Sequence, residues 1–96
     1  MRLRQSPRAS ADLDGIYEYG AANHGIEAAL TYIEAIEQRF QLLLDHARSG
    51  RAEDAIVPGL RSLPSQSHRI FYRIDGDTIS INRVLHMAAD AGRWME

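Results

Sequence analysis

Two β-strands joined by a tight turn are predicted from one stretch, His68-Arg69-Ile70-Phe71-Tyr72-Arg73-Ile74-Asp75-Gly76-Asp77-Thr78-Ile79-Ser80-Ile81-Asn82-Arg83-Val84-Leu85-His86. Asp75-Gly76 is typical of a hairpin turn, because both central positions of such a turn need positive φ. In the first strand, alternate residues are predicted to point to opposite faces of the sheet. One face carries the apolar residues Ile70, Tyr72 and Ile74, and the other carries Arg69, Phe71 and Arg73. The second strand is predicted to carry Ile79, Ile81, Arg83 and Leu85 on one face and Ser80, Asn82, Val84 and His86 on the other.

An arginine interrupts the apolar face of the second predicted strand. Arg83 falls in register with Ile79 and Ile81. A buried charge is costly unless it is paired, so we expect Arg83 to lie at the rim of the sheet or to have a partner. A further strand is predicted just upstream, within residues 58–64.

Two helices are predicted before these strands. Ser6-Pro7 is typical of a helix start, because serine can cap free backbone N–H groups and proline fits the first helical position. Apolar residues then recur at helical spacing, at Ala9, Leu13, Ile16, Tyr17 and Gly20. Asn23-His24-Gly25 breaks the pattern, and a longer helix is predicted from 26 to 47. The short link makes the two helices an antiparallel hairpin.

The second helix is apolar beyond a single stripe. The additional apolar residues are Ala28, Tyr32, Ala35 and Leu42. They either pack against the first helix or leave a face for a partner, and the pattern is compatible with both.

The predicted order of elements is strand, helix, helix, then three strands. Residues 1–6 are expected to form an edge strand, residues 48–54 a polar loop, and residues 87–96 a final helical turn. This order predicts an α+β fold in a single domain, residues 1–96, with the helical hairpin packed on a small, mainly antiparallel sheet. The opposite face of the sheet is left for the C-terminal segment or for something else.

The composition excludes several classes of protein. The 96 residues include no cysteine, and all eleven basic residues are arginine, with a net charge of −2. A disulfide framework, a thiol nucleophile and a catalytic lysine are therefore excluded. A general nucleic-acid binder is disfavoured, because such proteins carry a basic excess. No window approaches the roughly 20 apolar residues of a membrane span, so we expect a soluble protein of the cytoplasm.

Standard catalytic motifs are missing from the sequence. It contains no glycine-rich phosphate loop, no nucleophile elbow and no His-Glu-x-x-His, and its four histidines show no pair at helical or hairpin spacing. No cofactor and no metal site is therefore predicted. What remains is a polar cluster, Arg61, His68, Arg69, Tyr72, Arg73, Arg83 and His86. This cluster is a solvated sheet face, a surface for an anionic partner, or a ribonuclease site with His86 as acid or base beside arginines.

The chain resembles the ParE toxins of the RelE/ParE toxin–antitoxin superfamily. The motifs that carry the resemblance are Ser6-Pro7 with Ala9, Asp12-Leu13 and Ile16; Ala29, Tyr32 and Ile33; Pro58-Gly59-Leu60-Arg61-Ser62; His68-Arg69-Ile70-Phe71-Tyr72-Arg73; and Ile79, Ile81 and Arg83-Val84-Leu85-His86 with Asp90. They cover nearly the whole chain in order, and the run from Gly59 to His86 is the specific part. Met87-Ala88-Ala89 departs from the pattern, because an arginine is common there.

The resemblance implies a bacterial toxin that a ParD-type antitoxin holds inactive by folding its disordered tail along the toxin's helices and sheet. It implies DNA gyrase as the target, inhibited without catalysis, and no direct sequence-specific DNA binding by this chain. Contacts to antitoxin or target are then expected from Tyr32, Arg61, Arg69, Tyr72, Arg73, Arg83, His86 and Arg93. One alternative is a RelE-like, ribosome-dependent mRNA endoribonuclease, with Arg61, Arg83 and His86 as catalytic residues, although the lack of lysine weakens it. Another is a degenerate member that binds its antitoxin without being toxic.

Overall fold

A five-stranded sheet and a pair of long helices make up most of the protein. The computed structural model describes residues 1–95. The elements are β1 (Arg2–Gln5), α1 (Pro7–His24), α2 (Ile26–Asp45), β2 (Arg51–Ala52), β3 (Arg61–Ser65), β4 (His68–Asp75), β5 (Thr78–His86) and α3 (Ala91–Trp94). The strand order is β1-β5-β4-β3-β2, with β1 parallel to β5 and the other neighbours antiparallel. The predicted α+β fold with a mainly antiparallel sheet is therefore confirmed.

Two details of the predicted element order need correction. The segment expected to be a polar loop contains β2, in which Arg51 pairs with Ser62 and Ala52 with Arg61. The expected final helical turn is α3, which is shorter than the range 87–96, and residue 96 lies outside the described residues.

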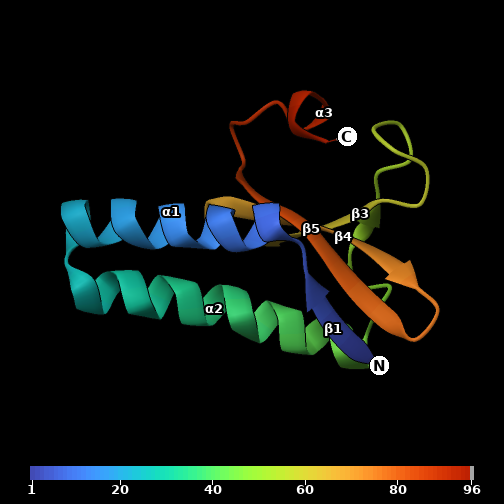
Figure 1. Cartoon of the computed structure of the whole chain (residues 1–96), viewed down its shortest axis with the longest axis horizontal. Coiled ribbons are helices and arrows are strands. Elements are labelled where there is room, and N and C mark those ends of the chain that lie inside the picture. Colours follow the sequence, from blue (N-terminus) through green and yellow to red (C-terminus); the bar gives the residue numbers. More distant parts are fainter. Residues whose placement is uncertain (96) are drawn as a thin grey trace.

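The helices form the predicted hairpin. They lie side by side, and the turn between them is at the end of the molecule away from the sheet (Figure 1). Gly25 makes this turn at φ 91°, a conformation that other residues rarely adopt. The two helices approach closely at Gly20, where an added Cβ would lie 3.2 Å from the Cβ of Ala29.

Ser6 fixes the start of α1 to the sheet. Its Oγ accepts a hydrogen bond from the backbone N–H of Ala9 at 3.0 Å, as the predicted cap requires. The same hydroxyl donates to the carbonyl of Asn82 at 2.7 Å, and the Ser6 N–H donates to the carbonyl of Ile81 at 2.9 Å. The cap therefore determines where α1 begins and also attaches it to β5.

The main core lies between the helical hairpin and one face of the sheet. Its buried members are Ala9, Ile36, Phe40, Leu43, Leu63, Ile70, Tyr72, Ile79, Ile81 and Val84. Of the additional apolar residues of α2, Tyr32 and Leu42 pack against this core, whereas Ala28 is exposed.

A β-bulge in β5 changes the predicted side-chain faces. Tyr72 pairs with Ile81, but the preceding residue, Phe71, pairs with Arg83, so Asn82 is an extra residue. A bulge reverses the alternation beyond it. Val84 therefore joins the main core, and the prediction that Leu85 shares a face with Ile79 and Ile81 is wrong.

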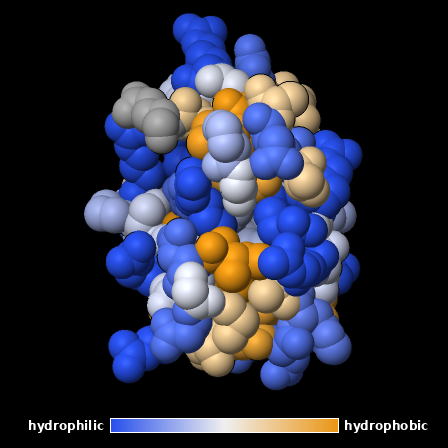
Figure 2. All heavy atoms as spheres, turned by 90° about the vertical axis from the view of Figure 1, so that its right-hand side faces the viewer, coloured by the Kyte–Doolittle hydropathy of each residue, from blue (hydrophilic) through white to orange (hydrophobic). Residues whose placement is uncertain are grey.

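The opposite face of the sheet carries a smaller core. Leu60, Phe71 and Leu85 are buried there, and the partly buried residues Ile56, Val57, Ala89, Ala91 and Met95 pack against them. The C-terminal segment, one of the two predicted covers, thus shares this face with the loop before β3. From the end of the molecule opposite the helix turn, the surface is mostly hydrophilic with small apolar patches (Figure 2).

Within residues 1–95, no helix is long and apolar enough to cross a membrane.

Candidate functional site

An open groove of about 750 Å³ separates the helical hairpin from the ends of β4 and β5. We call it the helix–sheet groove. It is lined by Ala11, Asp12, Gly15, Ile16, Tyr19, Gly20 and His24 of α1, by Ala28, Ala29 and Tyr32 of α2, and by Ser67, His68, Val84, Leu85 and His86. Tyr19 is 69% exposed although it is large and aromatic. The groove therefore combines an apolar helical wall with a polar end at the strands.

Two histidines form that polar end. His68 and His86 are directly opposite each other in the β4–β5 register, and their rings meet edge to face with centroids 5.3 Å apart. The sequence-based expectation that no histidines pair at hairpin spacing is wrong for these two. The bulge at Asn82 explains the error. In a regular hairpin that starts from the Asp75–Thr78 pair, the residue opposite His68 would be Leu85 and not His86.

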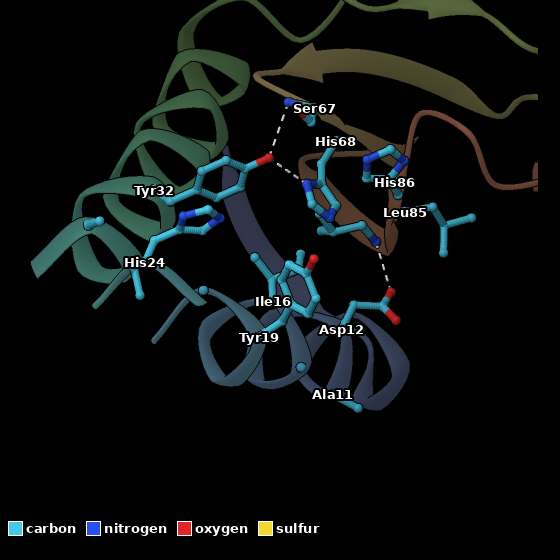
Figure 3. Close-up of a pocket in the computed structure, with 15 residues that line it drawn as sticks. Ala11, Asp12, Ile16, Tyr19, His24, Tyr32, Ser67, His68, Leu85 and His86 are labelled. Atoms are coloured by element: carbon cyan, nitrogen blue, oxygen red, sulfur yellow. Dashed lines mark hydrogen bonds between the residues drawn. The ribbon is translucent and has the colours of Figure 1, made fainter. Parts of the chain in front are cut away.

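Tyr32 holds the ring of His68. The Tyr32 hydroxyl and His68 Nδ1 are 2.6 Å apart, and the hydroxyl also accepts a hydrogen bond from the N–H of Ser67 at 3.1 Å. In Figure 3, Tyr32 reaches from α2 to His68, and His86 lies beside it. Burial lowers the pKa of His68 below its ordinary value of 6.5, and the nearby His86 lowers it further, while Asp12 opposes this. His68 is therefore favoured in its neutral form.

Asp12 and Arg83 form an ion pair at the edge of the groove. Asp12 accepts hydrogen bonds from Arg83 Nε at 2.9 Å and Nη2 at 2.8 Å, and from the N–H of Val84 at 2.9 Å. Arg83 Nη1 donates to the carbonyl of Trp94 at 3.1 Å. The expectation that Arg83 is paired is confirmed, and its guanidinium joins α1, β5 and α3.

Arg61 and Tyr72 hold the turn that follows α2. Arg61 donates to the carbonyl of Gly50 from Nε at 3.1 Å and Nη2 at 2.8 Å. Tyr72 donates to the carbonyl of Ala47 at 2.7 Å and accepts from the N–H of Gly50 at 2.9 Å. Tyr72 has 0% exposure, so the expectation that it makes a surface contact is corrected: it is a core residue.

Arg69 and Arg73 lie on the sheet face away from the groove. Arg69 Nη1 donates to the hydroxyl of Ser62 at 2.9 Å, and that hydroxyl donates to Glu53. Burial would raise the pKa of Glu53, but hydrogen bonds from Ser62 and Arg51 and the charges of Arg51 and Arg69 outweigh it and lower the pKa. Arg73 lies beside Gly59. Both arginines are half-buried, and their contacts with Ser62 and Gly59 help to hold the loop over the smaller core.

The structure does not gather the predicted site residues on one face. Tyr32 and His86 line the groove, and Arg83 and Arg93 line a separate shallow hollow with Trp94. Arg61 lies opposite Tyr72 of β4, whereas His86 lies opposite His68, four residues earlier on the same strand. Four residues along a strand span roughly 13 Å. The trio Arg61, Arg83 and His86 is therefore not assembled around one point.

Comparison with known proteins identifies the family. Residues 3–91 match the model of the ParE toxin of the type II toxin–antitoxin system parDE. The chain belongs to the ParE toxin family. It is 37% identical to Toxin ParE1 of Mycobacterium tuberculosis over 93 residues, which cover 96% of this chain and 95% of that protein.

Two solved structures share the ParE fold described above. A chain of the chromosomal ParDE toxin–antitoxin system of P. aeruginosa superimposes with a TM-score of 0.79 and 31% identity, covering 90% of this chain and 95% of that one. A chain of the YoeB–YefM complex of Staphylococcus aureus superimposes with a TM-score of 0.61 and 19% identity, over 90% of this chain and 95% of that one. At that identity the second likeness shows the fold alone.

Sequence reasoning missed three features of the groove in this ParE protein: the pairing of His68 with His86, the carboxylate of Asp12 and the exposed ring of Tyr19. The signal for the histidine pair was available as a break in alternation. Apolar residues occur at 79, 81 and 84, and two polar residues separate the last two, as a one-residue bulge requires. Tyr19 has no comparable signal, because its exposure depends on how the hairpin packs.

Proposed function

We propose that this toxin receives a segment of a ParD-type antitoxin in its helix–sheet groove, and that the free toxin inhibits DNA gyrase without catalysing a reaction. The observation that carries the proposal is the groove itself, an open apolar channel with the exposed Tyr19 ring on its wall. Grooves of this kind bind amphipathic helices through apolar side chains. The ParDE toxin–antitoxin system of P. aeruginosa, one chain of which has the same fold, supports this choice of partner.

The hydrogen bonds that Arg61 and Arg83 make within the protein favour a non-catalytic toxin. Arg61 is bonded to the backbone of the turn after α2, and Arg83 is bonded to Asp12 and Trp94. An endoribonuclease would need such cations aimed at one phosphate, within reach of a base. Of the three residues named for that activity, His86 is exposed and remains available.

Among the predicted contact residues, the accessible ones remain candidates. Tyr32 is partly exposed in the groove, and His86 and Arg93 are exposed. Arg69 and Arg73 are only half-buried and could still contact a partner on the other face.

Filling the groove tests the antitoxin part. Gly15→Phe places a ring in the groove, and an added Cβ there meets nothing within 4 Å. Ala22→Phe, on the same helix at an exposed position that does not line the groove, is the matched control. We expect affinity for the co-expressed ParD-type antitoxin to fall at least about tenfold, or roughly 1.4 kcal/mol, for Gly15→Phe alone. Equal affinity of both variants would exclude the groove as the docking site.

Activity assays test the target. Antitoxin-free protein is added to a gyrase supercoiling assay and to a translating ribosome extract. We expect loss of supercoiling, relieved by the antitoxin, and intact mRNA. Specific mRNA cuts with gyrase unaffected would favour the ribosome-dependent endoribonuclease. No effect in either assay, with the antitoxin complex intact, would identify a member that has lost its toxicity.

A further inference from the structure

The hydrogen bonds around His86 determine which of its ring nitrogens carries the proton. The N–H of Ala88 donates to His86 Nδ1 at 3.0 Å. A nitrogen that accepts a hydrogen bond presents its lone pair, so the proton of the neutral ring is on Nε2. His86 is exposed and lines the groove. It therefore offers an N–H donor to a ligand in the groove.

The hydrogen bonds around Tyr32 determine in the same way which ring nitrogen of His68 carries the proton. The Tyr32 hydroxyl accepts from Ser67, so its own proton needs an acceptor. His68 Nδ1, 2.6 Å away, is the acceptor that residues 1–95 provide. The proton of the neutral His68 ring is then also on Nε2.

The groove has little capacity of its own to satisfy these two donors. Within residues 1–95, the hydrogen bonds of both rings are made through Nδ1. Asp12, the carboxylate that lines the groove, already accepts three hydrogen bonds from Arg83 and Val84. An occupant that displaces water from the histidines must therefore bring an acceptor, since a donor that is buried without one loses the hydrogen bond it made to water.

We propose that the segment which docks in the helix–sheet groove places a carboxylate of an Asp or Glu side chain against His68 and His86. This rests on the proposed function, because it gives the chemistry of the antitoxin segment in that groove. The two rings are adjacent, and the two oxygens of a carboxylate accept hydrogen bonds from two donors. The apolar residues of the same segment face Ile16 and Tyr19 on the helical wall.

A transition-metal ion is a poor alternative occupant. A metal ligand must present a nitrogen lone pair, whereas both Nε2 atoms carry protons in the arrangement above. Moving the proton of His86 to Nδ1 would set it against the N–H of Ala88 and break that hydrogen bond. The tautomers favour an acceptor over a cation.

A double-mutant cycle tests the proposal. The toxin variants are His68→Ala, His86→Ala and, as matched control, His24→Ala, a third histidine that lines the groove but is not part of the pair. Each Asp and Glu of the ParD-type antitoxin is replaced in turn by Asn or Gln, and dissociation constants are measured for all combinations. We expect one antitoxin carboxylate whose loss weakens binding about tenfold with the wild-type toxin and with His24→Ala, but less than about twofold with His86→Ala, which has no donor to lose.

NMR of the histidine side chains provides a second measurement. A bound carboxylate favours the charged imidazole, so the pKa of His68 should rise when the antitoxin binds. Asp12, Tyr19, His24 and Tyr32 are the other titratable groups lining the groove, and they are the same in every variant except His24→Ala. An upward shift of one pKa unit corresponds to tenfold tighter binding below the free pKa than above the bound one.

The outcomes separate this proposal from the proposed function. If Gly15→Phe blocks binding but the effect of every antitoxin carboxylate is additive with that of His86→Ala, the groove docks the antitoxin and the carboxylate proposal is wrong. An unchanged or lowered pKa of His68 in the complex would likewise overturn it. If Gly15→Phe binds normally, the docking site itself is elsewhere.

Discussion

Asp12 and Arg83 are joined by two parallel hydrogen bonds, Oδ1 to Nη2 at 2.8 Å and Oδ2 to Nε at 2.9 Å. Their side chains are only 14% and 13% exposed. Paired charges with this geometry and burial are strongly coupled, whereas an exposed pair contributes little. The pair connects the first turns of α1 to β5 next to the bulge. The main role of Arg83 is therefore to stabilise the fold rather than to contact a partner.

Removing one partner of this pair should destabilise the protein severely. Asp12→Leu removes the carboxylate that accepts from Arg83 Nε and Nη2 and from the N–H of Val84. We expect a loss of about 3 kcal/mol in the free energy of unfolding. The double variant Asp12→Leu with Arg83→Met removes both charges and should lose clearly less than the sum of the single variants. Urea denaturation of the three variants measures this coupling.

Additive losses would contradict the coupling. The expected result also bears on binding experiments, because charge reversal at Arg83 then reduces antitoxin binding through unfolding. Arg93→Glu, at an exposed position, is the cleaner probe of the neighbouring surface.

The hydroxyl of Tyr72 should contribute through the turn after α2. Tyr72→Phe keeps the ring in the core but leaves the N–H of Gly50 and the carbonyl of Ala47 without their partner. An unsatisfied buried group costs about 1–3 kcal/mol, so we expect a loss in that range by urea denaturation. Tyr19→Phe, at an exposed ring, should change stability by less than about 0.5 kcal/mol. Equal effects would show that the Tyr72 bonds are unimportant.

Stability should decrease as the pH falls, in two separate windows. The pKa of His68 is lowered in the folded protein, so the unfolded chain binds more protons just below pH 6.5 and stability is lost there. The lowered pKa of Glu53 has the same sign, and its contribution is lost as the pH falls below 4.5. Melting temperatures measured between pH 7.5 and 4 should therefore decrease in both windows.

A histidine variant separates the two windows. His68→Gln should flatten the decrease between pH 7 and 5.5, whereas His46→Gln, at an exposed position outside the groove, should leave it unchanged. If the melting temperature of His68→Gln changed with pH in the same way as that of the wild type, the loss of stability below pH 6.5 could not be assigned to His68.

Local patterns were enough to predict most of the fold. Alternation and the Asp75-Gly76 turn predicted the β4–β5 hairpin, and Ser6-Pro7 predicted the first residue of α1. These signals depend on a residue and its near neighbours in the chain. Short-range patterning therefore recovered the order of helices and long strands.

The candidate site was harder to predict because it depends on one inserted residue. Asn82 shifts the register, and just beyond it the N–H of Val84 donates a hydrogen bond to Asp12 of α1. That bond forms only once α1 has docked on the sheet. The pairing of His68 with His86 follows from the same shift, and β2 is likewise defined by its pairing with β3 rather than by its own sequence.

The two glycines inside α1 should respond oppositely to substitution. Gly15 is exposed and an added Cβ meets nothing within 4 Å, so Gly15→Ala should raise the free energy of unfolding by about 0.5–1 kcal/mol through helix propensity. Gly20 is where α1 approaches α2, and Gly20→Val forces branched methyl groups against Ala29. Overpacking of that kind costs about 1–3 kcal/mol. If urea denaturation showed that both variants are stabilised, the close approach of the helices at Gly20 and Ala29 would be refuted, because helix propensity alone favours replacing glycine at either position.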